Sequence, residues 1–293
     1  MRGLLLLSLL LSLALAQTKV VLLGTGNPNA NPERMGPSIA VIVNGKSYIV
    51  DFGPGVVRRA SKAFENGIEE MAMPNLTHAF ATHLHSDHTL GLSDLIFTPW
   101  VLDRKRPLQL YGPKGINAMA SNILRAYRED IKIRTTGGQP HNKTGYKVIA
   151  HQIRPGVVFK EDHLTVTAFK VNHGKVERAY GYKFETKDKT VVISGDAAPS
   201  ESIVEQCNGC DMLFHEVYSL GKFQLKPPEW KAYHSTYHTS TKELATIANR
   251  ARPERLILYH QIFWGATEKE ILKEILQDYS GVVISGKDLD VFE

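Results

Sequence analysis

The segment Thr82-His83-Leu84-His85-Ser86-Asp87-His88-Thr89 places three imidazoles and a carboxylate within six consecutive positions. The residues before it, 76–82, are apolar and rich in threonine, which is typical of a β-strand. The residues after it, 90–96, have the pattern of a helix start. The cluster is therefore predicted to lie in a strand-to-helix loop, where side chains from alternate positions can converge on one point.

The residue types in this cluster favour a metal site. Imidazole nitrogen and carboxylate oxygen suit zinc, which needs three or four such ligands. His83 and His85 face the same way on an extended strand end, whereas Asp87 and His88 follow the turn and point elsewhere. One short loop can therefore serve two neighbouring metal ions. A polar surface loop with incidental histidines is the alternative, and the dense HxHxDH spacing argues against it.

The chain of 293 residues begins with a short basic start and an apolar run over residues 4–15. Ala14-Leu15-Ala16 is a small-x-small cleavage site, typical of a secretory signal peptide. We predict a signal peptide at 1–16, a single hydrolase domain at 17–293, and export to the periplasm or medium. An uncleaved N-terminal anchor is the alternative. No later segment is apolar for long enough to span a membrane.

The net charge of +5 and the pI near 9.0 permit an anionic substrate. They do not establish a nucleic-acid partner, because no long block of Lys and Arg is present. Cys207 and Cys210 have CxxC spacing, and two thiols cannot form a zinc ribbon. In an oxidising compartment they can form a local disulfide, and free thiols are the alternative.

Strands and helices are predicted along the whole chain, and a polar loop near the site mouth is predicted over 131–147. The predicted strands are 19–23, 38–43, 46–50, 76–82, 108–111, several within 157–184, 190–194, 212–216, 255–259 and 281–292. The predicted helices are 56–66, 116–128, 201–206, 241–251 and 267–279. His173, Asp196 and His260 each follow an apolar strand, which is where open α/β sheets place their sites.

The HxHxDH motif followed by His, Asp and His resembles the signature of the metallo-β-lactamase superfamily over essentially the whole mature chain. The resemblance implies an α/β fold, an αββα four-layer sandwich with a dinuclear zinc site at one end. In that assignment the ligands are His83, His85 and His173 for the first Zn²⁺, Asp87, His88 and His260 for the second, and Asp196 between them. Two ions roughly 3.5–4 Å apart would share a water and leave a bridging hydroxide as nucleophile.

Asp51 ends an early strand. It is either an outer partner that orients a ligand imidazole or a simple turn carboxylate.

A second set of residues resembles the ribonuclease Z branch of this superfamily. His215-Glu216 and His238-Thr239-Ser240 look like motifs in which the glutamate and the later histidine relay a proton to the leaving group. Glu216 is expected to hold His238 in place and cationic. With the ligand Asp87, these two are the predicted catalytic residues. His234-Ser235-Thr236 is the rival motif, and we prefer His238 because the predicted helix 241–251 follows it.

Three features argue against a tRNA-processing member: the predicted signal peptide, the Asp51-Phe-Gly-Pro-Gly55 variant, and the short interval after the third-motif histidine. His173 and Asp196 are only 23 positions apart, which leaves no room for the long basic arm of such enzymes. The chain looks closer to exported, arylsulfatase-like members. Four aromatic residues are candidates for an apolar pocket or for the core: Phe97, Trp100, Phe263 and Trp264.

The leading hypothesis is therefore an exported di-zinc hydrolase of a small anionic ester, either a sulfate ester or a phosphodiester, with a lactone as a further substrate class. One alternative is a ribonuclease Z-type endonuclease that processes the 3′ end of tRNA, so a nucleic-acid partner is kept but not favoured. The other is a non-catalytic metal-binding protein. A homodimer is compatible with the resemblance, and the sequence does not determine the oligomeric state.

Overall fold

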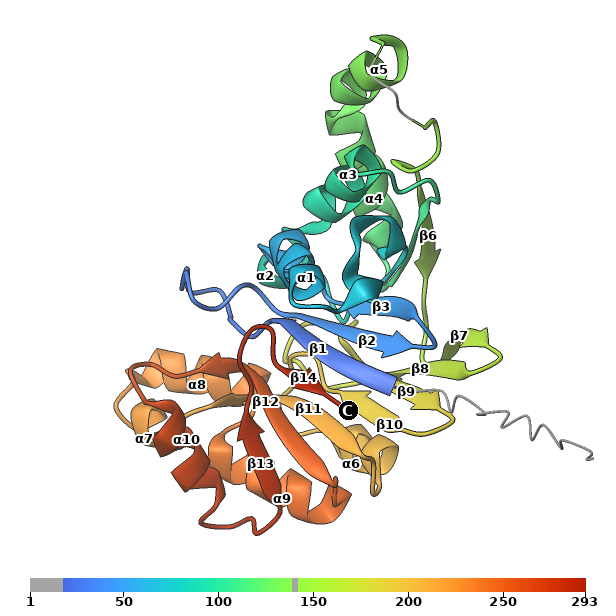
Figure 1. Ribbon diagram of the computed structural model, residues 1–293. Coiled ribbons are helices and arrows are strands. Elements are labelled where there is room, and N and C mark those ends of the chain that lie inside the picture. Colours follow the sequence, from blue (N-terminus) through green and yellow to red (C-terminus); the bar gives the residue numbers. More distant parts are fainter. Residues whose placement is uncertain (1–17, 139–141) are drawn as a thin grey trace, which may run out of the picture.

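The computed structural model describes residues 18–138 and 142–293. The predicted signal peptide at 1–16 lies outside these residues. Two mixed sheets pack face to face and helices cover their outer faces (Figure 1). The predicted αββα sandwich is thereby confirmed. Within the described ranges, no helix is both long and apolar enough to cross a membrane.

Each sheet has seven strands. The first sheet has, in order, β14 (Val291–Phe292), β1 (Thr18–Gly24), β2 (Ser38–Val43), β3 (Lys46–Val50), β4 (His78–Phe80), β5 (Leu108–Gly112) and β6 (Val148–Gln152). The second has β13 (Val282–Ser285), β12 (Arg255–Ile262), β11 (Met212–Tyr218), β10 (Thr190–Ile193), β9 (Tyr180–Thr186), β8 (Leu164–Lys170) and β7 (Gly156–Glu161).

Most of the longer helices form two outer layers, one on each sheet. The first sheet is covered by α1 (Val56–Glu65), α3 (Leu92–Val101) and α4 (Ile116–Ala126), and the second by α6 (Glu201–Cys207), α9 (Thr241–Ala251) and α10 (Glu268–Ile275). The shorter or peripheral helices are α2 (Ser86–Thr89), α5 (Arg128–Thr136), α7 (Leu220–Phe223), α8 (Pro228–Tyr237) and two 3-10 turns, Glu69–Met71 and Met73–Asn75.

The central strands are apolar on both faces because each sheet is covered on both sides there, whereas the edge strands β6 and β7 are partly exposed. In β1, Val20 and Leu22 belong to the core between the sheets, whereas Val21 and Leu23 pack against the helices of the first outer layer. This separation follows from the two-residue period of a strand. Continuous apolar runs such as 20–23 are therefore what a four-layer fold requires, and the polar residues are left to the strand ends.

Several regions differ from the expectations. The predicted last strand 281–292 is two strands, β13 and β14, which belong to different sheets, and β6 was not predicted. Residues 131–147 were predicted to be a loop at the site mouth, but α5 occupies Arg128–Thr136. This helix lies at the tip of the projection drawn in green in Figure 1, and it does not line the cavity described below. The helix α8 was not predicted, although Pro228 at its first turn is a helix-start signal. Cys207 and Cys210 form a disulfide at the end of α6.

Candidate metal centre

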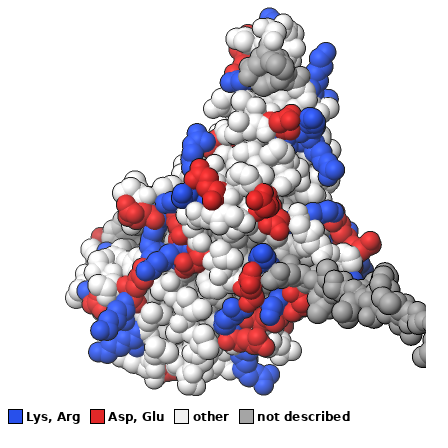
Figure 2. Space-filling view, viewed as in Figure 1, with Lys and Arg blue, Asp and Glu red and all other residues white. Residues whose placement is uncertain are grey.

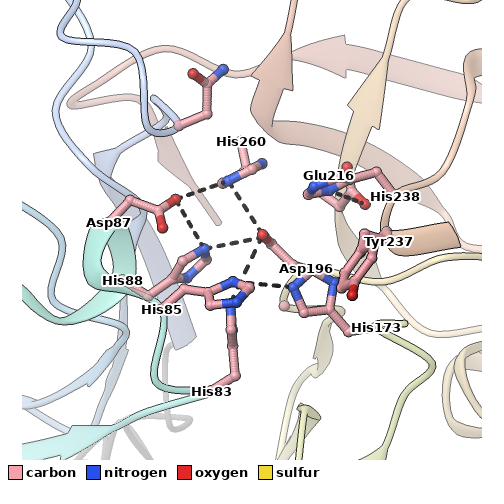
Figure 3. A network of polar contacts seen from close by, with 12 residues as sticks. His83, His85, Asp87, His88, His173, Asp196, Glu216, Tyr237, His238 and His260 are labelled. Carbon is pink, nitrogen blue, oxygen red and sulfur yellow. Dashed lines mark hydrogen bonds and ion pairs between the residues drawn. The ribbon is translucent and has the colours of Figure 1, made fainter. Parts of the chain in front are cut away.

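Seven polar side chains from both sheets converge at one edge of the sandwich (Figure 3). They come from the β4–α2 loop, from α2, from the segments after β8 and β10, and from β12. They are His83, His85, Asp87, His88, His173, Asp196 and His260. The sandwich thus brings together all seven residues that the resemblance pointed to. His260 lies within β12, which continues to Ile262 and does not end at Tyr259 as predicted.

The first group contains His83, His85, His173 and Asp196, whose potential ligand atoms all lie within 4.8 Å of one another. Nε2 of His173 is 3.3 Å from Nδ1 of His85. Nε2 of His83 lies 4.0 Å from Oδ2 of Asp196. Three nitrogens and one oxygen are therefore arranged around a common point, as a tetrahedral zinc site needs.

The second group contains Asp87, His88, His260 and the same Asp196. Nε2 of His260 lies 3.3 Å from Asp87 and 3.4 Å from Asp196. Nε2 of His88 lies 3.2 Å from the other oxygen of Asp196. Because Asp196 belongs to both groups, its carboxylate can join two adjacent metal ions.

The donors in this centre fit metal ions. Nε2 of His83, Nε2 of His88 and Oδ1 of Asp196 are buried and make no hydrogen bond of acceptable geometry. Buried polar atoms without hydrogen-bond partners are costly, so such atoms directed at one point indicate a metal-binding site. Nitrogen and carboxylate donors suit zinc. The chemistry of the donor set therefore agrees with the metal ions that the fold implies.

Asp51 holds two of the imidazoles in place. Its carboxylate accepts hydrogen bonds from Nδ1 of His88 at 2.7 Å and from the amide and hydroxyl groups of Thr82, each at 2.8 Å. The Thr82 hydroxyl oxygen in turn lies 2.9 Å from Nδ1 of His83 and can accept a hydrogen bond from it. With Nδ1 protonated in both rings, each Nε2 keeps its lone pair for the centre. Of the two interpretations of Asp51, these contacts favour the orienting partner.

Replacing Asp51 with asparagine is expected to weaken zinc affinity by roughly 10- to 100-fold, the usual effect of losing an outer partner. The Asp51 carboxylate accepts hydrogen bonds from three donors, and in the variant the asparagine NH₂ group would face one of these donors. Competition with a chromophoric chelator measures the affinity. Asp130→Asn, at an exposed ion pair with Arg134, is the matched control. Equal affinity in wild type and Asp51→Asn would contradict the orienting role.

Two further ligand positions depend on long-range contacts. Nδ1 of His173 donates to the carbonyl of Tyr237, the last residue of α8, at 2.8 Å. His260 adopts φ 45°, and the β11–β12 register shifts opposite it, between His215 and Val217. Such a bulge turns a side chain away from the regular alternation of the strand. The sequence does not indicate that a backbone carbonyl orients His173, and it gives little indication of the bulge at His260.

Burial and charge act in opposite directions on the ionisable groups. Burial lowers the pKa of His83, and it lowers the pKa of His173 to about 4, so both are neutral, as metal binding requires. Burial alone would raise the pKa of Asp196, but His260 and His88 hold it well below its usual range. Burial also opposes the charged form of His88, and the carboxylates of Asp196 and Asp51 outweigh it and raise the pKa.

The predicted proton-relay pair is in contact. Nδ1 of His238 lies 3.2 Å from Oε1 of Glu216, which also accepts from the amides of Thr239 and Ala197. Burial lowers the pKa of His238 to about 4 and raises the pKa of Glu216 well above its usual range. Both shifts favour the uncharged forms of the two side chains, whereas a cationic His238 is the expectation from the sequence. The rival His234 has no hydrogen bond to Glu216 and lies against the rings of Trp230 and Trp264.

A cavity of about 900 Å³ opens beside the centre. Its walls include His85, Asp87, Asp196, His238 and His260, together with Asn27, Pro28, Asn29, Lys226, Pro227, Glu229, Trp230, Tyr233, His234, Ile262 and Trp264. Of the four aromatic candidates, only Trp264 lines it. Phe97 and Trp100 lie in the first outer core, and Phe263 packs beside α10 and against Arg34. Trp230 and Tyr233 were missed because α8 was not predicted.

Comparisons with known proteins agree with this architecture. Residues 46–261 match the family model described as "Beta-lactamase superfamily domain". Ribonuclease Z of Mycobacterium sp. (strain KMS) is 33% identical over 246 residues, which are 83% of this chain and 84% of that protein. Ribonuclease Z of Mycobacterium bovis (strain BCG / Pasteur 1173P2) is 29% identical over 276 residues, 92% of this chain and 96% of that protein.

Solved structures share the fold at lower identity. Human tRNase Z, short form, superposes with a TM-score of 0.70 at 21% identity, covering 94% of this chain and 98% of that one. The metallo-β-lactamase fold protein YhfI from Bacillus subtilis has the same TM-score and coverage at 19% identity. These likenesses establish the fold.

Proposed function

Because the chain belongs to the β-lactamase superfamily and is a metal-dependent hydrolase of ester bonds, we propose that it cleaves a phosphodiester of RNA as a ribonuclease Z-type endonuclease. The observation that carries the proposal is that two ligand groups, which share Asp196, lie beside a cavity lined by His238, whose ring contacts the buried Glu216. The relatives named ribonuclease Z match over more than four-fifths of the chain. The small sulfate ester expected from the sequence has no support among these relatives.

Different residues of the chain have different roles in the proposed reaction. Two zinc ions held by the ligand groups would supply Lewis acidity toward the phosphoryl oxygens and an acidified water between them. Asp51 and Thr82 keep the imidazoles of His83 and His88 aimed at the centre. His238 stands in the cavity wall, where its ring can give a proton to the departing oxygen, and Glu216 fixes its orientation.

A second candidate is a small phosphodiester. His173 and Asp196 are separated by little more than β9 and β10, so no long arm is inserted between them. On the face seen in Figure 2, basic and acidic side chains are interspersed and do not form one basic surface. Both features argue against strong electrostatic binding of a large polyanion, because such binding depends on clustered Lys and Arg. A short substrate that fills the cavity does not need such a hold.

The test compares a tRNA precursor with a 3′ trailer, a diaryl phosphodiester and an aryl sulfate, using zinc-loaded protein with His85→Ala as the blank. Cleavage of the precursor at its 3′ side is expected, with loss on chelation and recovery on adding zinc. Cleavage of the diaryl ester alone would support the second candidate. Faster turnover of the sulfate than of either phosphodiester would overturn both.

A further inference from the structure

One wall of the cavity is aromatic, and the metal chemistry makes no use of it. The helix α8 supplies Trp230 and Tyr233, and the turn after β12 supplies Trp264. Trp230 is 52% exposed and Tyr233 is 40% exposed. Large aromatic rings left open to water beside a reaction centre favour binding of a complementary planar group, because burying them against it is favourable.

The rings are held in fixed positions. The ring of His234 lies between the two indoles, stacked on Trp230 at 5.7 Å and edge-on to Trp264 at 4.5 Å between centroids. Tyr218 supports Trp264 from another side at 5.6 Å. A surface whose rings are already ordered loses little conformational entropy on binding a ligand, which raises the affinity.

Trp264 is also held in an unfavourable backbone conformation. Its φ of 48° lies in the left-handed region, which is sterically unfavourable for a residue other than glycine. The neighbouring Phe263 is anchored against the guanidinium of Arg34 at 5.0 Å, and its carbonyl accepts from the amide of Ala266 at 2.8 Å. Strained conformations that persist tend to lie at functional sites. Here the strain directs an indole to the cavity.

Lys226 adds a positive charge to this wall. Its ammonium lies 4.7 Å from the centroid of the Trp264 ring. Among the described residues it makes no ion pair with a carboxylate, so its charge is available to an anionic ligand. The Asn27 side chain, which also lines the cavity, donates to the carbonyl of Gln261 at 2.8 Å and so ties the β1–β2 loop to β12. The cavity lining therefore combines aromatic rings, the Lys226 cation and polar side chains.

We propose that this aromatic wall, formed by Trp230, Tyr233 and Trp264, is a nucleobase-binding subsite for the nucleotide next to the scissile phosphate. The base stacks on the exposed rings, and Lys226 contacts a flanking phosphate. The cavity of about 900 Å³ is large enough for a nucleotide. The proposal rests on the proposed function, since it assumes that the phosphate lies at the metal centre. It adds that the enzyme selects phosphodiesters that carry a base.

Calorimetric titration of zinc-loaded protein with adenosine 5′-monophosphate and with ribose 5-phosphate tests the subsite. The nucleotide is expected to bind about 5- to 150-fold more tightly, the ratio supplied by stacking one base. Trp230→Ala and Trp264→Ala should each reduce that ratio toward one and leave ribose 5-phosphate binding unchanged. Phe64→Ala, at a 40% exposed ring on α1 outside the cavity, is the matched control.

Equal binding of the two ligands by wild type, or a full ratio in both tryptophan variants, would overturn the subsite. If Trp264→Ala fails to fold, as a melting curve would show, the half-exposed Trp230 still decides the question. RNA cleavage by wild type is a separate readout. If the wild type cleaves RNA but binds the nucleotide and ribose 5-phosphate equally, only the subsite is refuted. If it binds the nucleotide more tightly but cleaves no phosphodiester, only the proposed function is refuted.

Discussion

Replacing Asp196 with alanine is expected to reduce hydrolysis to background and to weaken both metal positions. Its carboxylate belongs to both ligand groups, within 3.2 Å of His88 and 3.4 Å of His260. Removing it leaves several buried nitrogens in each group without the shared oxygen. The loss of metal affinity should exceed the roughly 10- to 100-fold that follows from removing an outer partner. Metal content after dialysis and kcat/KM on a phosphodiester measure the two effects.

His85→Ala separates the two groups. His85 belongs only to the first ligand group, so this variant is expected to lose one metal ion, whereas Asp196→Ala weakens the binding of both. Asp130→Ala, at an exposed ion pair on α5, should keep wild-type metal content and activity. Full activity with unchanged metal in either ligand variant would remove the dinuclear assignment. A circular dichroism spectrum distinguishes loss of metal from loss of fold.

Replacing His238 with alanine is expected to slow substrates with poor leaving groups by about 10²- to 10⁴-fold, the range for a positioned general acid. Esters whose leaving group departs without a proton should be affected only slightly. The reason is geometric, because Glu216 fixes His238 in the cavity wall beside the metal centre. Rates for a series of phosphodiesters of rising leaving-group pKa give the slope, which should be steeper in the variant.

His234→Ala is the matched control for this series, because His234 lines the same cavity but makes no hydrogen bond to Glu216. It should leave the slope unchanged. A steeper slope in His234→Ala would transfer the role to the rival motif. An equal loss on good and poor leaving groups in His238→Ala would show that the residue positions the substrate and does not deliver a proton.

Much of the centre could be predicted from local patterns. The HxHxDH motif places four candidate ligands close together by its spacing alone. The other three, His173, Asp196 and His260, follow predicted apolar strands, and such strand ends meet at one edge of the sandwich. The substrate was harder to predict. The short interval from His173 to Asp196 and the predicted export argued for a small anionic ester, either a sulfate ester or a phosphodiester, whereas the relatives are named ribonuclease Z. Loops set the substrate, and loops carry weak sequence signals.

The amino-acid sequence by itself determined most of the strands and the HxHxDH cluster, because these depend on hydrophobic period and on short spacings. The four-layer class and the full set of seven ligands followed from the resemblance of the motif order to the metallo-β-lactamase superfamily. Only the tertiary structure decided which groups orient them. Asp51 meets His88 across 37 positions and the Tyr237 carbonyl meets His173 across 64, while the bulge at His260 needs the β11 register. The aromatic wall of α8 is likewise a product of packing. Such contacts join elements distant in the chain, and their formation depends on how whole layers pack, which no local pattern encodes.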